Sequence, residues 1–279
     1  MAGAMEQPGP TEQVDPLANA AFWRSLLEKP GSPLHRHRRL NRLLPSSPRC
    51  KVCAAPFRGP GGVLMRLRGI GQSNFNPQIC SICEHFARRY PGGAELELTL
   101  LFGDIRGSTA LAQRLGTVEF TRLVNRFYLA ATGVLTRHDA VIDRLLGDEV
   151  VAVFIPAFVE GHVAAAVRAA EGLLRATGHG DPGGPWVPVG VGVHTGPVFF
   201  GAVGHEGKTD ITVLGDNANV AARLASLAGP GEVLVSEVTA RAAGLDEPGQ
   251  ETRQLELKGR SEPIEVRVLR VGQTVAQQG

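Results

Sequence analysis

The clearest element in the pattern of hydrophobic and polar positions is a buried strand near Leu98. The segment LTLLFGDIRGST (98–109) begins as an apolar run, which is typical of a strand covered on both faces, and the run stops at Asp104. The residues that follow, Ile-Arg-Gly-Ser-Thr, predict a loop that opens a helix. The pattern therefore places one carboxylate at the tip of a strand.

A second carboxylate lies at the tip of a predicted hairpin. Residues 140–146 and 149–154 are short apolar runs joined by Gly147 and Asp148, a dipeptide typical of a tight turn. A single Asp in such a place usually serves only the turn. If the two strands are neighbours, however, Asp104 and Asp148 together can bind Mg²⁺, which takes one or two carboxylates along with phosphate oxygens. The pair predicts a two-metal phosphoryl-transfer site.

Strand and helix periods alternate through the rest of the chain. Ser108 or Thr109 can cap a helix whose apolar positions recur at helical spacing as far as Leu135. Residues 158–177, rich in Ala and Leu, predict a second helix, and residues 187–203 predict two strands around an HTG sequence. The order strand, helix, strand, strand, helix, strand predicts a ferredoxin-like α+β domain with helices on one face of the sheet.

Composition narrows the class of protein. The 279 residues suffice for one catalytic domain and a smaller module. With 29 Lys and Arg against 27 Asp and Glu, the formal net charge of +2 gives no reason to expect a nucleic-acid partner. No apolar run reaches the length of a membrane span, and the start lacks the features of a signal peptide. The simplest expectation is a soluble, cytoplasmic protein.

Four cysteines form two C-x2-C pairs, Cys50 with Cys53 and Cys80 with Cys83. Two such pairs complete the closed tetrahedral site that structural Zn²⁺ prefers. An iron-sulfur cluster uses the same thiolates, and a module without metal is a third alternative. The segment between the pairs has few apolar residues for a core, so a bound metal is expected to organise this module. The module is also expected to sense metal or redox state.

These features divide the chain into four parts. Residues 1–45 are expected to form a disordered tail and an amphipathic helix, which packs either on its own domain or on a partner. Residues 46–92 form the four-cysteine module, 93–272 the catalytic domain and 273–279 a tail. A short basic run at 35–39 is expected to be solvated surface.

One further pair of residues favours a phosphate ligand. Asn219 and Arg223 are four apart in a predicted helix, so they project from one face. The Arg guanidinium offers a planar fork to phosphate oxygens, and the Asn amide can hold a ribose or a water. Together they suit an incoming triphosphate.

Four stretches give the chain a family resemblance: LLFGDIRGSTALAQRLG, LLGDEVVAVF, GVGVHTGPVFFGAVG and ITVLGDNANVAARL. In this order they resemble the class III nucleotidyl cyclase catalytic domain over residues 95–269. The HTG sequence is broadly present in that family, so His194 is expected to be structural. The resemblance implies cyclisation of a nucleoside triphosphate to a 3',5'-cyclic nucleotide and pyrophosphate.

The resemblance also implies roles for particular residues. Asp104 and Asp148, with the carbonyl of Ile105, would hold two Mg²⁺ or Mn²⁺ ions. Asn219 and Arg223 would stabilise the transition state from the opposite protomer of a head-to-tail homodimer. The lysine that contacts the triphosphate in the family matches Lys258 in the Leu-Lys-Gly sequence near the end. One chain carries both halves of a site, so a symmetric dimer would hold two sites.

The base-reading positions match the family less well. They are Arg144, where adenylate cyclases usually have Lys, and Thr212. The fork of Arg144 can donate to adenine N1, to guanine O6 or to a pyrimidine carbonyl. ATP is the first expectation, with guanylate or pyrimidine cyclisation as alternatives. A degenerate domain that only binds nucleotide is a further alternative, although it would have no chemical need for all the matched site residues.

Overall fold

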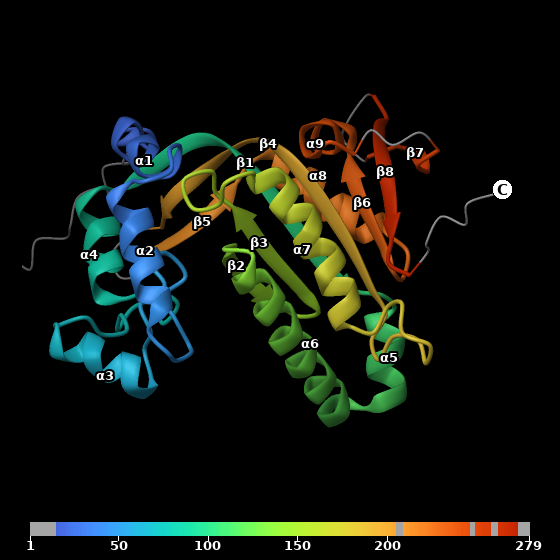
Figure 1. Ribbon diagram of the computed structural model, residues 1–279, viewed down its shortest axis with the longest axis horizontal. Coiled ribbons are helices and arrows are strands. Elements are labelled where there is room, and N and C mark those ends of the chain that lie inside the picture. The colour runs from blue at the N-terminus through green and yellow to red at the C-terminus, as the bar shows by residue number, and fades with distance from the viewer. Residues whose placement is uncertain (1–14, 205–208, 246–248, 258–261, 273–279) are drawn as a thin grey trace, which may run out of the picture.

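The computed structural model describes residues 15–204, 209–245, 249–257 and 262–272. Lys258 therefore lies outside the described residues, as do most of the expected N-terminal tail and the tail 273–279. Helices α1 to α4 gather at one end of the molecule, and the long strands β1 and β4 run from them into the main sheet (Figure 1).

The described elements follow the alternation that the sequence predicts. The helices are α1 (Ala20–Leu27), α2 (Pro33–Leu43), α3 (Gly59–Leu67), α4 (Ser81–Arg89), α5 (Ser108–Leu115), α6 (Thr117–Arg137), α7 (His162–Ala176), α8 (Asp216–Leu227) and α9 (Glu237–Ala243). The strands are β1 (Gly92–Ile105), β2 (Val141–Leu146), β3 (Glu149–Phe154), β4 (Val189–Val203), β5 (Asp210–Leu214), β6 (Glu232–Ser236), β7 (Thr252–Leu255) and β8 (Ile264–Arg270).

The strands form one mixed sheet whose order confirms the predicted topology. The order is β2-β3-β1-β4-β6-β8-β7, with β5 paired to β4. Its first four strands run antiparallel to one another, and β1 lies between β3 and β4. This is the arrangement of a ferredoxin-like unit. The pairing of β4 with β6 is parallel and extends the sheet with a C-terminal part.

Helices cover both faces of the sheet, which corrects the expectation of one covered face. A Cβ at Gly103 would lie 2.8 Å from Leu173 of α7. A Cβ at Gly192 would lie 2.3 Å from the backbone nitrogen of Ala225 of α8. Gly192 pairs with Phe102, the neighbour of Gly103, so the two glycines point to opposite faces. Figure 1 shows α6 and α7 in front of the sheet and α8 behind it.

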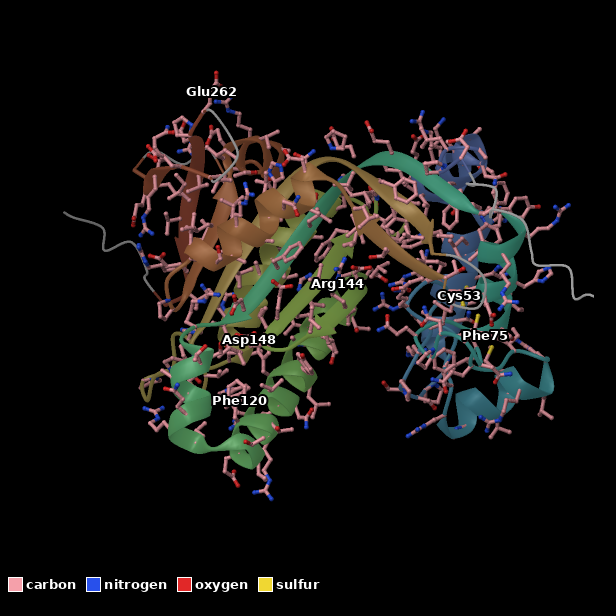
Figure 2. All side chains as sticks on the ribbon, turned by 180° about the vertical axis from the view of Figure 1, so that it is seen from behind. Cys53, Phe75, Phe120, Arg144, Asp148 and Glu262 are labelled. Carbon is pink, nitrogen blue, oxygen red and sulfur yellow. The ribbon has the colours of Figure 1, made fainter. Side chains whose placement is uncertain are left out.

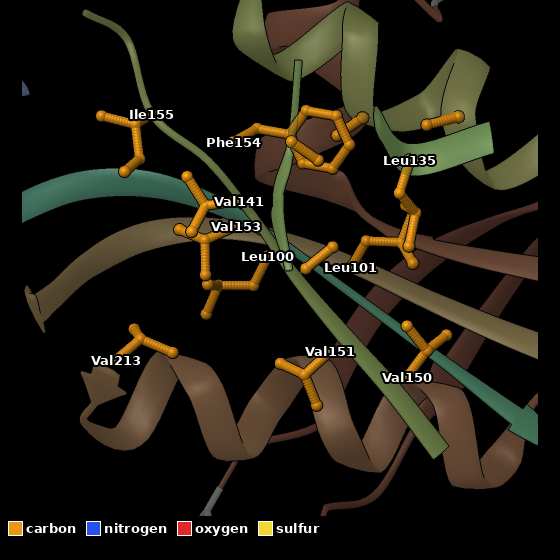
Figure 3. Packing of buried hydrophobic residues seen from close by; sticks show 14 of the residues in the cluster. Leu100, Leu101, Leu135, Val141, Val150, Val151, Val153, Phe154, Ile155 and Val213 are labelled. Atoms are coloured by element: carbon orange, nitrogen blue, oxygen red, sulfur yellow. The ribbon is translucent and has the colours of Figure 1, made fainter. Parts of the chain in front are cut away.

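The core on both faces of the sheet is built mainly from aliphatic residues of the central strands. Figure 3 shows these side chains packed between β1, β3 and the helices, and they are buried. The labelled members include Leu100, Leu101, Val150, Val151, Val153 and Phe154. Residues buried on both faces explain why these strands read as nearly continuous apolar runs in the sequence.

The long helix expected after β1 is two helices. Gly116 has a φ of +76°, a left-handed value that ends α5 and lets α6 begin in a new direction. The cap of α5 also differs from the expectation. Gly107, with a φ of +66°, occupies the cap position, and Ser108 is already helical. Apolar spacing alone did not reveal the break because it continues on both sides of Gly116.

The HTG sequence lies inside β4, so the two strands expected there are one. Thr195 pairs with Thr99 of β1, and their hydroxyls hydrogen bond at 2.9 Å. Gly196 allows close approach of α8, because a Cβ there would lie 2.7 Å from Asn217. His194 is buried, with Nδ1 2.7 Å from the Ser236 hydroxyl and Nε2 2.9 Å from Asn217 Oδ1. These contacts support the structural role expected for His194.

The N-terminal helices pack on their own chain. Trp23 and Leu27 of α1 are buried, and they belong to the same core cluster as the cysteine module and the sheet. The indole of Trp23 donates to the carbonyl of Tyr90 at 3.2 Å. The sequence implied that the module has too few apolar residues for a core of its own. In the structure the module shares one core with α1 and the sheet.

None of the described helices combines the length and the apolar character that crossing a bilayer requires.

The basic run at 35–39 belongs to α2, and one of its residues is not solvated surface. Arg38 is 6% exposed. Its guanidinium donates to the carbonyls of Lys51 and Val52, both at 2.9 Å, and of Ala140 at 2.9 Å. Arg38 therefore ties the first cysteine pair to the loop before β2.

Candidate active site

The two predicted carboxylates meet at one end of the sheet. Asp104 is the penultimate residue of β1, and Asp148 lies in the turn between β2 and β3. Because β1 and β3 pair directly, Asp104 lies opposite Glu149. The backbone N–H of Ile105 donates to the carbonyl of Asp148 at 3.2 Å. Figure 2 shows Asp148 at this end, near α5 and away from the cysteine module.

The electrostatics of this end favour a cation. Burial raises the pKa of Asp104, the neighbouring Asp148 raises it as well, and Arg106 opposes the shift. Burial and the charge of Asp104 also raise the pKa of Glu149. Carboxylates that repel one another in a partly desolvated place are stabilised by a bound positive charge. The oxygen donor set fits Mg²⁺ or Mn²⁺.

Glu149 and Arg106 at this end of the sheet were not predicted from the sequence. Glu149 follows the turn directly, and only the register of β3 on β1 shows that it faces Asp104. Arg106 forms an ion pair with Asp104 and also donates to the carbonyl of Ser226 at 2.7 Å, at the end of α8. Arg106 therefore links the first carboxylate to the helix that carries the predicted phosphate-binding pair.

Asn219 and Arg223 both lie on α8, as predicted. Asn219 is exposed and Arg223 is half-buried. Across the described residues, neither side chain forms a hydrogen bond or an ion pair with Asp104 or Asp148. Arg223 also has no ion pair with a carboxylate in that part of the chain. Within the described part of one protomer, the Asn/Arg pair thus makes no direct polar contact with the two carboxylates.

The two positions predicted to read the base, Arg144 and Thr212, come together around a buried acid. The Arg144 guanidinium donates through Nη2 to the Thr212 hydroxyl at 3.2 Å and through Nε to Asp143 Oδ2 at 2.8 Å. The Thr212 hydroxyl in turn donates to Asp143 Oδ2 at 3.0 Å. Asp143 is 2% exposed. It was not singled out from the sequence, where a polar residue inside a short strand gave no signal.

The four cysteines form one cluster, as the spacing predicted. The Sγ atoms of Cys50, Cys53, Cys80 and Cys83 all lie within 4.8 Å of one another. Figure 2 shows the sulfur atoms together beside Cys53. A tetrahedral ion with metal-sulfur bonds of about 2.3 Å separates its sulfurs by about 3.8 Å, so the cluster fits one ion.

The pKa values of the four thiols also favour a bound metal ion. Hydrogen bonds among the thiols, led by those with Cys50, raise the pKa of Cys53 and of Cys83, whereas hydrogen bonds from the other three thiols lower the pKa of Cys50 against the effect of burial. Four thiolates so close together repel one another, and a bound cation is what stabilises them all in the ionised form.

A family model supports this interpretation of the geometry. Residues 94–272, well over half of the chain, match the model described as the adenylate and guanylate cyclase catalytic domain. The chain belongs to this family. The cyclase domain so defined contains both carboxylates, the predicted base-reading residues and the Asn/Arg pair, and the four cysteines precede it.

Curated relatives match over part of their own length. An adenylate cyclase of Anabaena cylindrica is 35% identical over 136 residues, which cover 47% of this chain and 27% of that protein. An uncharacterised protein of Mycobacterium tuberculosis is 29% identical over 208 residues, or 71% of this chain and 37% of that protein. The chain thus spans well under half the length of either relative.

Solved cyclase structures match the same domain. The guanylyl cyclase Cya2 superposes with a TM-score of 0.57 at 27% identity, covering 67% of this chain and 98% of that one. The adenylyl cyclase CyaB from P. aeruginosa superposes with a TM-score of 0.54 at 26% identity, covering 63% and 94%. Solved structures named as guanylyl and as adenylyl cyclases share this fold, so the fold alone does not show whether adenine or guanine is bound.

Proposed function

We propose that this chain converts ATP to 3',5'-cyclic AMP and pyrophosphate at sites shared between two protomers. The observation that carries the proposal is the meeting of Asp104 and Asp148 at one end of paired strands, where their charges repel and favour a cation. Membership of the cyclase family supports cyclisation as the reaction of this carboxylate pair.

Each residue of the proposed site has its own role in the reaction. Asp104, Asp148 and the Ile105 carbonyl are the groups that would hold two Mg²⁺ or Mn²⁺ ions. When bound, such ions lower the pKa of the attacking hydroxyl and neutralise charge on the leaving pyrophosphate. Asn219 orients the ribose, and Arg223 offsets the charge that develops as the 3'-hydroxyl attacks the α-phosphorus. Lys258, outside the described residues, is proposed to contact the triphosphate.

The lack of direct contact between the two groups within one chain supports a head-to-tail homodimer. Within one chain, Asn219 and Arg223 do not contact the carboxylates, and the exposed Asn219 is available to another protomer. A two-fold dimer would bring each half to the other and form two equivalent sites. Isolated monomers are then nearly inactive. The proposed place of action is the cytoplasm, where thiols stay reduced.

ATP is the proposed substrate because the base-reading group can serve both polar groups on the adenine edge. Arg144 retains N–H groups that can donate to N1. The Thr212 oxygen keeps a lone pair that can accept from the N6 amine. The relative from Anabaena cylindrica, named as an adenylate cyclase, favours the same base. Guanine offers O6 and N1–H to the same groups, so GTP is the alternative that the experiment separates.

The test is to incubate the protein with each of the four ribonucleoside triphosphates and Mg²⁺ or Mn²⁺, and to identify products by mass. The expected result is 3',5'-cyclic AMP and pyrophosphate in equal amounts. A cyclic product from GTP, CTP or UTP alone would overturn the choice of base and keep the cyclase. No cyclic product from any of the four would show a degenerate domain that only binds nucleotide.

For the cysteine cluster, in residues 46–92, we propose one structural Zn²⁺. The purified protein is expected to contain about one zinc per chain, because the closed four-thiolate set suits this ion. Replacing Cys80, which is fully buried, by serine should remove the metal and lower the melting temperature. Metal analysis and calorimetry measure both.

The outcomes of the metal experiment are distinct. Iron with acid-labile sulfide would show a cluster in place of zinc. Metal-free protein with the same melting temperature would contradict a metal role. The metal is also proposed to gate catalysis, so chelator-treated protein should cyclise ATP more slowly. Equal rates at equal dimer content would remove that role.

A further inference from the structure

Lys51 connects the cysteine cluster to the base-reading group. It lies between Cys50 and Cys53 in the first pair, yet its side chain leaves the module and is only 5% exposed. Its Nζ donates to Asp210 Oδ1 at 2.7 Å and lies 4.0 Å from Asp143 Oδ1. No local pattern predicts this contact, because Asp143 and Asp210 lie far from Lys51 along the chain.

Asp143 needs a second cation. Its Oδ2 accepts from both Arg144 and Thr212, whereas its Oδ1 has no hydrogen bond within the described residues. A buried carboxylate with one oxygen uncompensated is costly, and the nearby Lys51 ammonium reduces that cost. Without Lys51, the uncompensated Asp143 Oδ1 would attract the Arg144 guanidinium away from its present position on Oδ2. The position of the base-reading fork therefore depends on Lys51.

Asp210 is a second point of contact between the cysteine module and the strands that carry Arg144 and Thr212. Besides Lys51, it accepts from the side-chain amide of Asn76 at 2.8 Å. Both donors belong to the cysteine module, and Asp210 begins β5, the strand on which Thr212 lies two residues later. The module thus fixes the strand end that presents the Thr212 hydroxyl.

The backbone of Lys51 is held by hydrogen bonds on both sides of its peptide unit. Its N–H donates to the carbonyl of Gln78 at 2.9 Å, two residues before Cys80. Its carbonyl accepts from the buried Arg38. The direction of the Lys51 side chain is therefore set by a backbone that Gln78 and Arg38 hold beside the cysteine cluster.

A cavity of about 620 Å³ lies where these elements face one another. Lys51, Gln72 and Gln78 line it from the module, and Asp143 and Arg144 line it from β2. The Arg144 side chain is 43% exposed. Figure 2 shows Arg144 on the side of the sheet that faces the module. The volume lies in the range of small-molecule sites.

We propose that the cysteine module forms one wall of the base pocket, and that Lys51 is a positioning residue that sets nucleotide selectivity through Asp143. The inference rests on the proposed cyclase function and extends it to a part of the chain outside the cyclase domain. Lys51 does not touch the base in this account. It holds Asp143 and Asp210, and through them it orients Arg144 and Thr212.

The test compares Lys51→Met with Lys51→Arg, and uses Lys29→Met, at an exposed lysine of the same N-terminal part, as the matched control. The measured quantity is the ratio of kcat/KM for the preferred nucleotide to that for each of the other three. Lys51→Met is expected to lower this ratio about tenfold, mainly through KM. Lys51→Arg should retain most of it, and Lys29→Met all of it. A purely structural role would not move selectivity at unchanged metal content.

A second variant guards against misfolding. Asp210→Asn removes the partner of Lys51 at a side chain that is 46% exposed, so the chain should fold, and selectivity should fall in the same direction. Unchanged selectivity in folded Lys51→Met, or in Asp210→Asn where Lys51→Met does not fold, would overturn the inference. A wild-type protein that cyclises no nucleotide would instead overturn the proposed function.

Discussion

Replacing Asp148 by asparagine is expected to lower the rate of cyclisation on the order of a thousandfold while the protein stays folded. Asn keeps the size of the side chain and is favoured in turns, so the β2–β3 hairpin should persist. It lacks the negative charge that a divalent cation needs. The same loss is expected for Asp104→Asn. The measurement is kcat at saturating ATP and Mn²⁺, together with the melting temperature.

A matched control separates charge loss from general damage. Asp181→Asn changes an exposed aspartate in the loop before β4 and should leave both rate and melting temperature unchanged. If folded Asp104→Asn or Asp148→Asn protein kept wild-type activity, the carboxylate site would be wrong. Recovery of activity at high Mn²⁺ would instead show weakened metal affinity, which supports the assignment.

Removing the guanidinium of Arg223 should lower kcat by a factor of about 100 to 1,000, with a smaller effect on KM. The reason is that Arg223 is proposed to offset charge that appears only as the phosphorus becomes five-coordinate. Arg223 is half-buried at the surface of α8, so Arg223→Ala should fold. Steady-state kinetics over a range of ATP concentrations separates the two parameters.

The control for this variant is Arg122→Ala, at an exposed arginine of α6 that pairs with Glu119. It should match wild type in both parameters. A large rise in KM with unchanged kcat in Arg223→Ala would assign Arg223 to ground-state binding. Wild-type values for both would remove Arg223 from the site.

The strand-tip carboxylates could be predicted because their signals are local. An apolar run buried on both faces ends where the backbone leaves the sheet, so Asp104 was expected at the end of a strand. The Gly147-Asp148 dipeptide marks a tight turn whatever surrounds it. The spacing of Asn219 and Arg223 likewise follows from helix geometry alone. Each of these depends on fewer than about ten neighbouring residues.

The parts that could not be predicted depend on contacts between distant segments. Arg38 looked like solvated surface because its neighbours are basic, and only tertiary structure supplies the carbonyls that it binds. The second covered face of the sheet depends on the close approach of α8 to Gly192. The hydrogen bond of Lys51 with Asp210 spans 159 positions. No periodicity encodes such a pair, since either partner alone resembles an ordinary surface charge.

The proposed site joins the carboxylates of one protomer to the Asn/Arg pair of its partner, and mixing two inactive variants tests this most directly. Asp104→Asn and Arg223→Ala are purified separately, mixed in equal amounts and allowed to exchange subunits. Half of the dimers are then mixed, and each holds one intact site, so about a quarter of wild-type activity is predicted to return. A mixture no more active than its components, with subunit exchange verified by mass, would contradict a site shared between protomers.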